Sequence, residues 1–362
     1  MKKNNALVAA ILGIVIVVLM VFYGQPATKE HGYTEPEQVV SYPTESELIV
    51  SSSGLAAVPD NLDATATSKP TRQQADATST DPAKIAYNDD WCISFTDLNP
   101  QDFAYYQRER ENWNITRGRI LPAIYEGRVM GNHASSQYIA PYMEASYDAI
   151  RLQIKEDNEF AMLAALYRPD LDLDFDTQRA IAHRLVVKGH TSTALSHLVN
   201  IEMVHARTIY RRSNQVNKEA EQHLYKAMAY TIYGIKHFDL DPASAYLSEV
   251  SSANFPLELK PRYALGTDNR IQEYLDWLTQ WIDEERANEN LQLPTADEFP
   301  KVARHNFESL LSRLHLDYGN ELQDLKAIVP ETTSTLLEGS ECVQRQVTFF
   351  GDLERRARSS IK

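Results

Sequence analysis

The sequence predicts an all-α domain that follows an N-terminal membrane anchor and a long polar linker. Residues 6–23 form an uninterrupted apolar run, and residues 24–85 are dominated by small and polar side chains. From about residue 87 onward, apolar residues recur at helical spacing while strand-like alternation is scarce. The chain therefore divides into an N-terminal stub (1–5), an anchor (6–23), a linker (24–85) and an exported helical domain (86–362).

The apolar run is long enough to cross the hydrocarbon core of a membrane as one helix, because about 18 residues at ~1.5 Å each span most of it. Lys2 and Lys3 precede the run and no basic cluster follows it, which favours an N-in, C-out orientation. We therefore expect a single-pass protein of the inner membrane, with a cytoplasmic stub and a periplasmic domain. The alternative is a signal peptide cleaved after Ala27.

The linker has the composition of a disordered tether. From Gly24 to Lys84 the chain consists mainly of Ser, Thr, Ala, Pro, Asp and Gln. Such a segment buries too little apolar surface to offset the entropy that ordering costs. A flexible chain of this length has a typical span on the order of 40 Å, which allows the folded part to stand clear of the bilayer.

The charge of the chain limits the classes of partner. The formal net charge is −14, which argues against nucleic acid or anionic lipid headgroups as the main partner, since binding to either requires clustered Lys and Arg. Arg355, Arg356, Arg358 and Lys362 form a basic tail. We interpret this tail as a set of charges that complement the dipole at the end of a helix.

Cys92 and Cys342 are the only cysteines of the chain. One stands near the beginning of the predicted domain and the other in its last helical segment. An even pair in an exported protein predicts a disulfide. The alternative is two buried free thiols.

Five segments of the domain have helix signals. Asn99 and Pro100 have the pattern of an N-cap followed by the proline favoured at the first helical position. In Asp268–Asn288 the apolar residues recur at helical spacing and the acidic residues fall on another face. We expect further helices over Ser135–Lys155, Phe307–Leu316 and Thr333–Arg358.

Three similar segments in the middle of the chain suggest a repeat. Ala161–Tyr167, Ala194–Leu198 and Ala227–Ile232 are small and apolar, and their starts are 33 residues apart. With Gly189 as a turn between helices, residues 158–239 resemble Sel1-like and tetratricopeptide repeats. The resemblance implies an α-solenoid of helix pairs, whereas an irregular helical bundle is the alternative.

Four histidines and one acid are candidate metal ligands. His183, His190, His197 and His205 are seven or eight residues apart, and Glu202 lies three residues before His205. A Glu and a His at this spacing can hold a metal ion on a helix, but such sites use a second pair, and none is evident. We expect polar or groove histidines, no metal ion and no cofactor.

The run from Asp170 to Asp176 alternates acidic and apolar residues as some calcium loops do. Phe175 stands where such a loop requires glycine, and Ile181 stands where it requires a bidentate Glu. We therefore expect an inter-helix loop in which Asp176 caps a helix that begins near Thr177.

Aromatic residues are abundant in the first third of the domain. Such side chains suit recognition surfaces, but here we favour a role in the core. The residues are Tyr105, Tyr106, Trp113, Tyr125, Tyr138, Tyr142 and Tyr147.

The sequence contains no complete motif for nucleophilic, zinc-dependent or nucleotide-dependent catalysis. The leading hypothesis is therefore a membrane-anchored periplasmic scaffold or adaptor that binds another envelope protein or peptide, with residues unknown. The alternative is an envelope hydrolase or lyase with an acidic active site on a helical scaffold. That alternative requires a cleft with converging acids whose pKa values are perturbed. A sensor subunit is a third hypothesis, but the stub leaves little chain for signalling.

Overall fold

The computed structural model describes residues 92, 98–120, 124–125, 128–129, 136–260, 269–295 and 298–360, which all belong to one compact unit of the chain. In chain order, the elements are α2 (Pro100–Thr116), β1 (Ile124–Tyr125), β2 (Arg128–Val129), α3 (Ser136–Met143), α4 (Tyr147–Lys155), α5 (Glu159–Tyr167), the 3₁₀ helix η4 (Pro169–Leu171), α6 (Phe175–Val187), α7 (Thr191–Ser213), α8 (Lys218–Lys236), α9 (Asp241–Ser251), the 3₁₀ helix η5 (Leu257–Leu259), α11 (Arg270–Asn288), α12 (Lys301–Asp317), α13 (Gly319–Ile328), α14 (Glu331–Glu338) and α15 (Glu341–Ser360). Across these residues the regular structure is helical except for the two-residue strands β1 and β2, which pair antiparallel. The prediction of an all-α domain is confirmed for this part of the chain.

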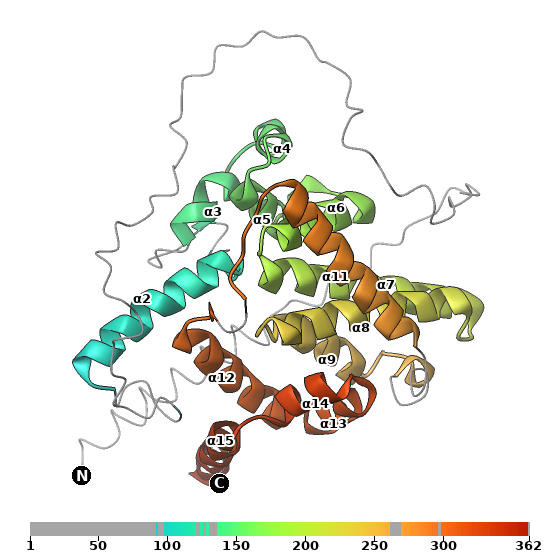
Figure 1. The fold of residues 1–362 in the computed structure, drawn as a ribbon. Coiled ribbons are helices and arrows are strands. Elements are labelled where there is room, and N and C mark those ends of the chain that lie inside the picture. The colour runs from blue at the N-terminus through green and yellow to red at the C-terminus, as the bar shows by residue number, and fades with distance from the viewer. Residues whose placement is uncertain are drawn as a thin grey trace, which may run out of the picture. The chain divides into compact units, whose positions relative to one another are not determined.

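Helix α8 is at the centre of the unit. All residues from 227 to 235 are buried, and α8 packs against α7, α9, α11 and α14. A helix covered on every side needs small or apolar residues around its whole circumference. Ala227, Ala229 and Gly234 are among those that meet this requirement, and Figure 1 shows α7, α9 and α11 around α8.

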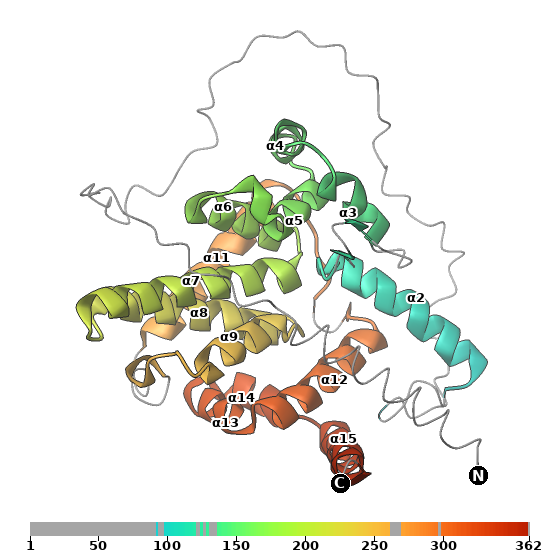
Figure 2. The same cartoon turned by 180° about the vertical axis from the view of Figure 1, so that it is seen from behind.

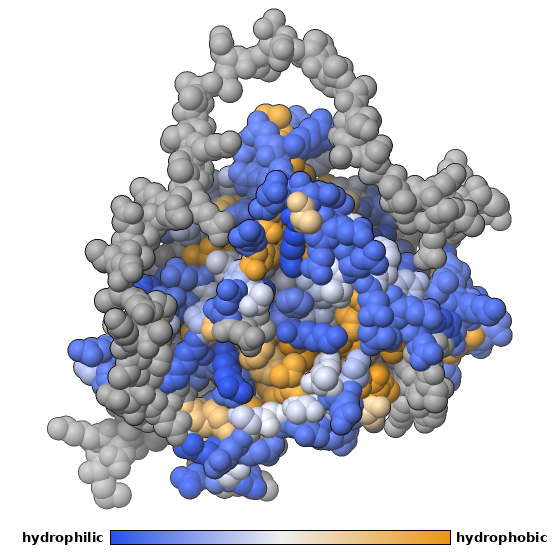
Figure 3. All heavy atoms as spheres, in the orientation of Figure 1, coloured by the Kyte–Doolittle hydropathy of each residue, from blue (hydrophilic) through white to orange (hydrophobic). Residues whose placement is uncertain are grey.

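The remaining helices lie on two sides of this centre. Helices α3 to α6 gather on one side and α12 to α15 on the other, as two opposite views show (Figures 1 and 2). A second, smaller core joins α2 to α12 and contains Tyr106, Trp113, Val302 and Ala303. Hydrophilic side chains cover much of the face seen in Figure 3, and apolar ones are exposed in the region of α8, α9 and α14.

Cys92 and Cys342 meet across the fold. Their Cα atoms are 5.3 Å apart, which is compatible with the predicted disulfide. The side-chain amide of Gln346 donates a hydrogen bond to the carbonyl oxygen of Cys92. The segment that precedes α2 is thereby joined to the first turn of α15.

Several predicted helices are present, and their caps have the expected chemistry. Asn99 Oδ1 accepts hydrogen bonds from the backbone N–H groups of Gln101 and Asp102 at the start of α2, with Pro100 at the first helical position. The segment predicted as Asp268–Asn288 is α11, whose buried side faces α8. The segment predicted as Phe307–Leu316 lies within the longer α12.

Two predicted helices are wrong because each is divided in two. The segment 135–155 forms α3 and α4, because the hydroxyl of Ser146 accepts a hydrogen bond from Ala149 N and starts a new helix. The segment 333–358 is divided between α14 and α15 at Gly339, whose φ of +77° ends the first helix. A side chain with a β-carbon would strain this conformation, and its Cβ would lie 2.8 Å from Val343 Cβ.

The predicted cap at Asp176 is also wrong. Helix α6 begins at Phe175, and Asp174 is its N-cap, because the Asp174 carboxylate accepts a hydrogen bond from Thr177 N at 2.7 Å. The run contains four closely spaced acids, Asp170, Asp172, Asp174 and Asp176, and their alternation does not show which one precedes the first helical residue.

The predicted stub, anchor and linker, residues 1–85, lie outside the described residues. Among the helices that the structure does describe, none combines the length and the apolar character needed to cross a bilayer.

Candidate functional site

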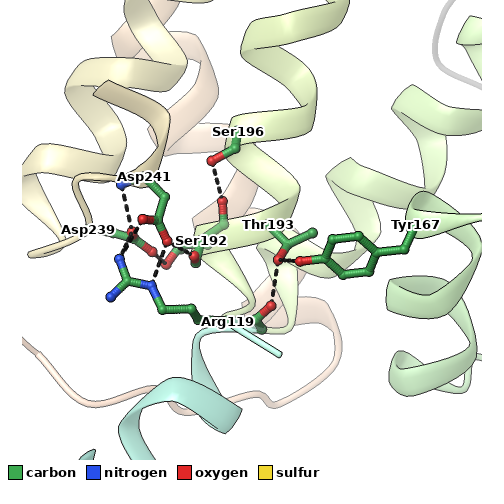
Figure 4. Close-up of polar contacts among 9 residues, drawn as sticks. Arg119, Tyr167, Ser192, Thr193, Ser196, Asp239 and Asp241 are labelled. Carbon is green, nitrogen blue, oxygen red and sulfur yellow. Dashed lines mark hydrogen bonds and ion pairs between the residues drawn. The ribbon is translucent and has the colours of Figure 1, made fainter. Parts of the chain in front are cut away.

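A cluster of polar side chains joins the end of α2 to the start of α7 and to the turn between α8 and α9 (Figure 4). Arg119 Nε and Nη2 donate hydrogen bonds to the two carboxylate oxygens of Asp241, each at 2.6 Å. Ser192 Oγ donates to the same carboxylate. A bidentate pair of this kind fixes both distance and orientation. The cluster therefore holds together three segments that are far apart in the sequence.

A second set of contacts extends this junction toward α5. Thr193 Oγ1 donates a hydrogen bond to the carbonyl oxygen of Gly118 at 2.6 Å and lies 2.7 Å from the hydroxyl of Tyr167 (Figure 4). Gly118 has a φ of +67°, and a Cβ added there would lie 2.9 Å from His190 Cβ. Glycine is therefore required for the chain after α2 to approach α7 this closely.

Asp239 is the most deeply buried acid of the junction, with 4% of its surface exposed. It accepts hydrogen bonds from Thr191 Oγ1 at 3.0 Å and from Asp241 N at 3.2 Å, while Arg119 Nη2 is 4.0 Å away. Burial, and next the charge of Asp241, raise the pKa of Asp239 from 3.8 to about 6, against the opposing effect of Arg119. The Asp239 carboxyl group therefore retains a proton at pH values where a solvent-exposed Asp is ionised.

A carboxyl group with a raised pKa can serve as a general acid, provided that a substrate reaches it. The cavity beside Asp239 has a volume of about 10 Å³, which is the space of a single water molecule. Its walls include Trp113, Arg117 and Phe307. The perturbed acid thus meets one requirement of the hydrolase or lyase alternative, but the space for a substrate is lacking at this position. The arrangement is suited to a structural ion pair.

Glu202 is the centre of a second buried cluster, between α6, α7 and α8. Arg179 Nε donates to Glu202 Oε1 at 3.1 Å, and His223 Nδ1 lies 2.5 Å from Oε2. Burial acts to raise the pKa of Glu202, but the hydrogen bond with His223 and the charge of Arg179 outweigh it and lower the pKa below 4.5. Glu202 is therefore an ionised carboxylate within the helical core.

The structure does not bring the four predicted histidines together, and each has its own neighbour. His183 Nε2 lies 2.8 Å from Tyr230 OH, His190 Nε2 lies 3.2 Å from Glu159 Oε2, His197 Nε2 lies 2.7 Å from Gln178 Oε1, and His205 stacks on His223 with ring centres 5.0 Å apart. Burial lowers the pKa of His183 to about 4, so this ring is neutral at pH 7. Within the described residues, no group of three His, Cys, Asp or Glu side chains is placed to hold a metal ion.

Three of the four acids of the run 170–176 likewise have separate partners. Asp170 forms an ion pair with Arg168 at 2.5 Å, and Asp176 forms one with Arg179 at 2.7 Å. Asp174 is the N-cap of α6. Since these carboxylates point to different groups, the run acts as a connection between helices.

The predicted aromatic cluster is divided between the core and the surface. Tyr106 and Trp113 are buried in the smaller core, as we expected. Tyr138 and Tyr147 are exposed. The aromatic residues therefore do not form a single recognition surface.

An open groove runs along one side of α11, next to the end of α8. Three carboxylates and one ammonium group line it, together with small and polar side chains. The lining residues are Lys236, Leu275, Asp276, Thr279, Gln280, Asp283, Glu284 and Ala287. Asp276 and Glu284 accept hydrogen bonds from the side-chain amides of Gln272 and Gln280, which are neutral groups and add no positive charge. The groove is therefore acidic and accessible to solvent.

Sequence reasoning placed the acids of α11 outside its apolar stripe, but did not identify the groove, because Lys236 comes from another helix. It also missed the junction of Figure 4. The only local signal was the pair Asp239 and Asp241 just before Pro242, which has the pattern of a helix start. No spacing in the sequence indicates that Arg119, 122 residues away, is the partner of Asp241.

No family model matches the chain, and neither a curated protein nor a solved structure does.

Proposed function

We propose that this protein is a membrane-anchored scaffold of the bacterial envelope, and that its helical domain binds a basic segment of another envelope protein or peptide. Residues 6–23 would anchor the chain in the inner membrane, and residues 24–85 would serve as the tether. The domain would lie in the periplasm. The observation that carries the proposal is the acidic groove along α11.

The charge of the groove determines the chemistry of the proposed partner. Asp276, Asp283 and Glu284 line the groove together with a single cationic residue, Lys236, so negative charge is in excess. Complementary charge across an interface speeds encounter and selects partners. A segment with Lys or Arg side chains and a few small apolar ones fits this lining better than an acidic or purely apolar segment.

The finer architecture belongs to the same proposal. We take α5 with α6, and α7 with α8, as two repeat-like helix pairs of an α-solenoid. Support comes from the packing of consecutive helices: α5 packs on α6, α6 on α7, and α7 on α8. Helix α7 also packs on α9. The first two predicted repeat starts lie on α5 and α7, whereas the third lies within α8. Stacked helix pairs provide extended surfaces on which partners bind.

The groove is tested by photo-crosslinking in cells with the full chain. A photoreactive residue at the exposed Thr279 should capture a defined partner, whereas one at the exposed Asn200 of α7 should not. The triple variant Asp276→Asn, Asp283→Asn and Glu284→Gln neutralises the groove and should lower the yield of crosslinked partner about tenfold. Three surface charges contribute roughly 0.5 kcal/mol each, and their sum of about 1.5 kcal/mol corresponds to a tenfold change in affinity.

A matched control removes the same charge elsewhere. Glu156, Glu331 and Glu338 are exposed and lie outside the groove, so their replacement by Gln should leave the yield unchanged. An equal loss in both triple variants would mean that net charge, and not the groove, attracts the partner.

The location is tested separately. A periplasmic reporter fused after Lys362 should be active and a cytoplasmic reporter inactive. The reverse result would contradict the proposed orientation.

A further inference from the structure

Helix α15 exposes two large apolar side chains on one face. Phe349 is 41% exposed and Leu353 is 46% exposed, and residues four apart lie next to each other on a helix. Val343 and Gln346, in the first two turns of the helix, are buried, and α15 packs against α12. The helix is thus attached to the domain through residues near its start, and further along it exposes an apolar pair to solvent.

Arginines flank this apolar pair. Arg345 precedes Phe349 by one turn and Arg356 follows Leu353 by three residues, and both arginines are exposed. Arg355 is exposed as well and forms an ion pair with Asp352. From residue 345 to residue 362 the chain has five basic and two acidic residues, although the whole chain has a net charge of −14. The end of the chain is therefore its basic region.

Two exposed apolar side chains between basic residues are typical of a helix that lies on an anionic membrane surface. The apolar pair enters the interface while the guanidinium groups contact lipid phosphates. A second copy of this helix would fit less well, since the arginines of the two copies would repel each other. Charge complementarity therefore favours a lipid surface as the occupant of this face.

The disulfide joins α15 to the segment that follows the proposed tether. Cys342, in the first turn of α15, is bound to Cys92, so the tether reaches the domain at this helix. A tethered surface is present at a high effective concentration, which makes even a weak contact significant. In this one respect the inference rests on the proposed membrane anchor.

We propose that the face of α15 formed by Arg345, Phe349, Leu353 and Arg356 lies on the anionic surface of the membrane that holds the anchor. The contact would orient the domain on the bilayer. It involves a different helix from the acidic groove of α11, so the two contacts do not use the same side chains.

The test uses the full chain reconstituted in vesicles, with a fluorescent label on Leu353→Cys. Both native cysteines are paired, so the introduced thiol is the one that reacts without reductant. Spin-labelled lipid should quench this label about twofold more strongly in phosphatidylcholine vesicles that contain phosphatidylglycerol than in phosphatidylcholine alone. A label on Leu257→Cys, at a site that is 56% exposed, should show no such difference.

Charge reversal provides the matched comparison. Arg345→Glu with Arg356→Glu should abolish the effect of phosphatidylglycerol, whereas Arg211→Glu with Arg212→Glu, at exposed positions of α7, should preserve it. Equal quenching in both lipids, no quenching at residue 353, or crosslinking of two copies through residue 353 without quenching would each overturn the proposal.

The anchor is judged by a different readout. Alkaline carbonate extraction that strips the chain from the vesicles would refute the anchor, while quenching measured before extraction still reports on α15. Failure of the anchor and failure of the α15 contact are thereby distinguished.

Discussion

Asp239, between α8 and α9, and Glu202, on α7, are both buried carboxylates, and their pKa values move in opposite directions. The pKa of Asp239 is raised to about 6, whereas that of Glu202 is lowered. Exposure does not explain the difference, because Asp239 is 4% exposed and Glu202 only 1%. The less exposed acid is the one whose pKa is lowered.

The partners of the two carboxylates account for the contrast. Glu202 contacts the guanidinium of Arg179 and the ring of His223 directly. Asp239 contacts a hydroxyl and a backbone N–H, and it shares Arg119 with a second carboxylate, Asp241. Burial penalises the charge of either acid, and direct cationic partners offset that penalty only at Glu202. Within one fold, neighbours decide the protonation state of a buried acid.

The largest expected effect is that of Glu202→Ala. This change leaves Arg179 and His223 facing each other without the carboxylate between them, and removal of one member of a buried ion pair costs about 3–5 kcal/mol. Urea unfolding at pH 7 measures the loss. Asp239→Ala is the comparison, with an expected loss of about 1–3 kcal/mol for the unpaired hydroxyl and N–H groups. Equal losses would contradict the contrast between the two acids.

Asp239→Asn should show a pH-dependent difference from the unchanged protein. The folded state keeps the Asp239 proton up to a pH of about 6, while the unfolded state releases it near 3.8. The folded state therefore binds more protons between these values, and the stability of the unchanged protein falls as pH rises through this window. The Asn side chain of the variant does not titrate in this window. As pH rises from below 3.8 to above 6, the free energy of unfolding of the variant should therefore gain about 3 kcal/mol relative to that of the unchanged protein. Thermal or urea unfolding at several pH values measures this gain. A constant difference would refute the raised pKa.

Glu202→Gln should show the opposite sign. The lowered pKa of Glu202 means that its ionised form stabilises the protein above the unfolded pKa, and that this stabilisation is lost as pH falls through the folded pKa. We expect a deficit of about 2 kcal/mol at pH 7, typical of a hydrogen bond to a charged group, which shrinks as the solution becomes more acidic than pH 4.5. Urea unfolding at a series of pH values is the measurement. A deficit that grows on acidification would contradict the assignment.

The smallest effect is expected from Arg119→Lys. A lysine keeps the positive charge near Asp239 and Asp241 but loses the two parallel hydrogen bonds to Asp241, which should cost about 1 kcal/mol. Arg108→Lys is a suitable control, because Arg108 is exposed and its ion pair with Glu109 lies on the surface. Urea unfolding at pH 7 compares the loss in free energy of unfolding between the two variants. A loss as large as that of Glu202→Ala would show that the geometry of Arg119, and not only its charge, holds the junction together.

Local patterns in the sequence predicted much of the fold. Capping by Asn99 and the apolar spacing of 268–288 depend on residues within a few positions of one another, and both were identified correctly. The breaks at Ser146 and Gly339 were missed, because serine and glycine are also tolerated inside helices and only tertiary packing decides between the two uses.

The clusters were less predictable, because their members come from different helices. Glu202 stands three residues before His205 in the sequence, yet its hydrogen-bond partner is His223 on the next helix. The direction in which a side chain leaves α7 is decided by how α7 packs on α8, and the spacing of residues along one helix does not contain this information. The acidic groove was equally inaccessible, since Lys236 and α11 meet only in the folded chain.

The link between Cys92 and Cys342 also limits how far the protein can be stretched. The two cysteines are separated by 250 positions, so the intervening chain begins and ends at one covalent point. If tension were applied through the segment before Cys92, unfolding of this loop would add no length between that segment and α15. Reduction of the bond would release a contour length on the order of 900 Å. While the bridge is intact, a load on the chain therefore bypasses α2 to α14 and passes directly to the last helix.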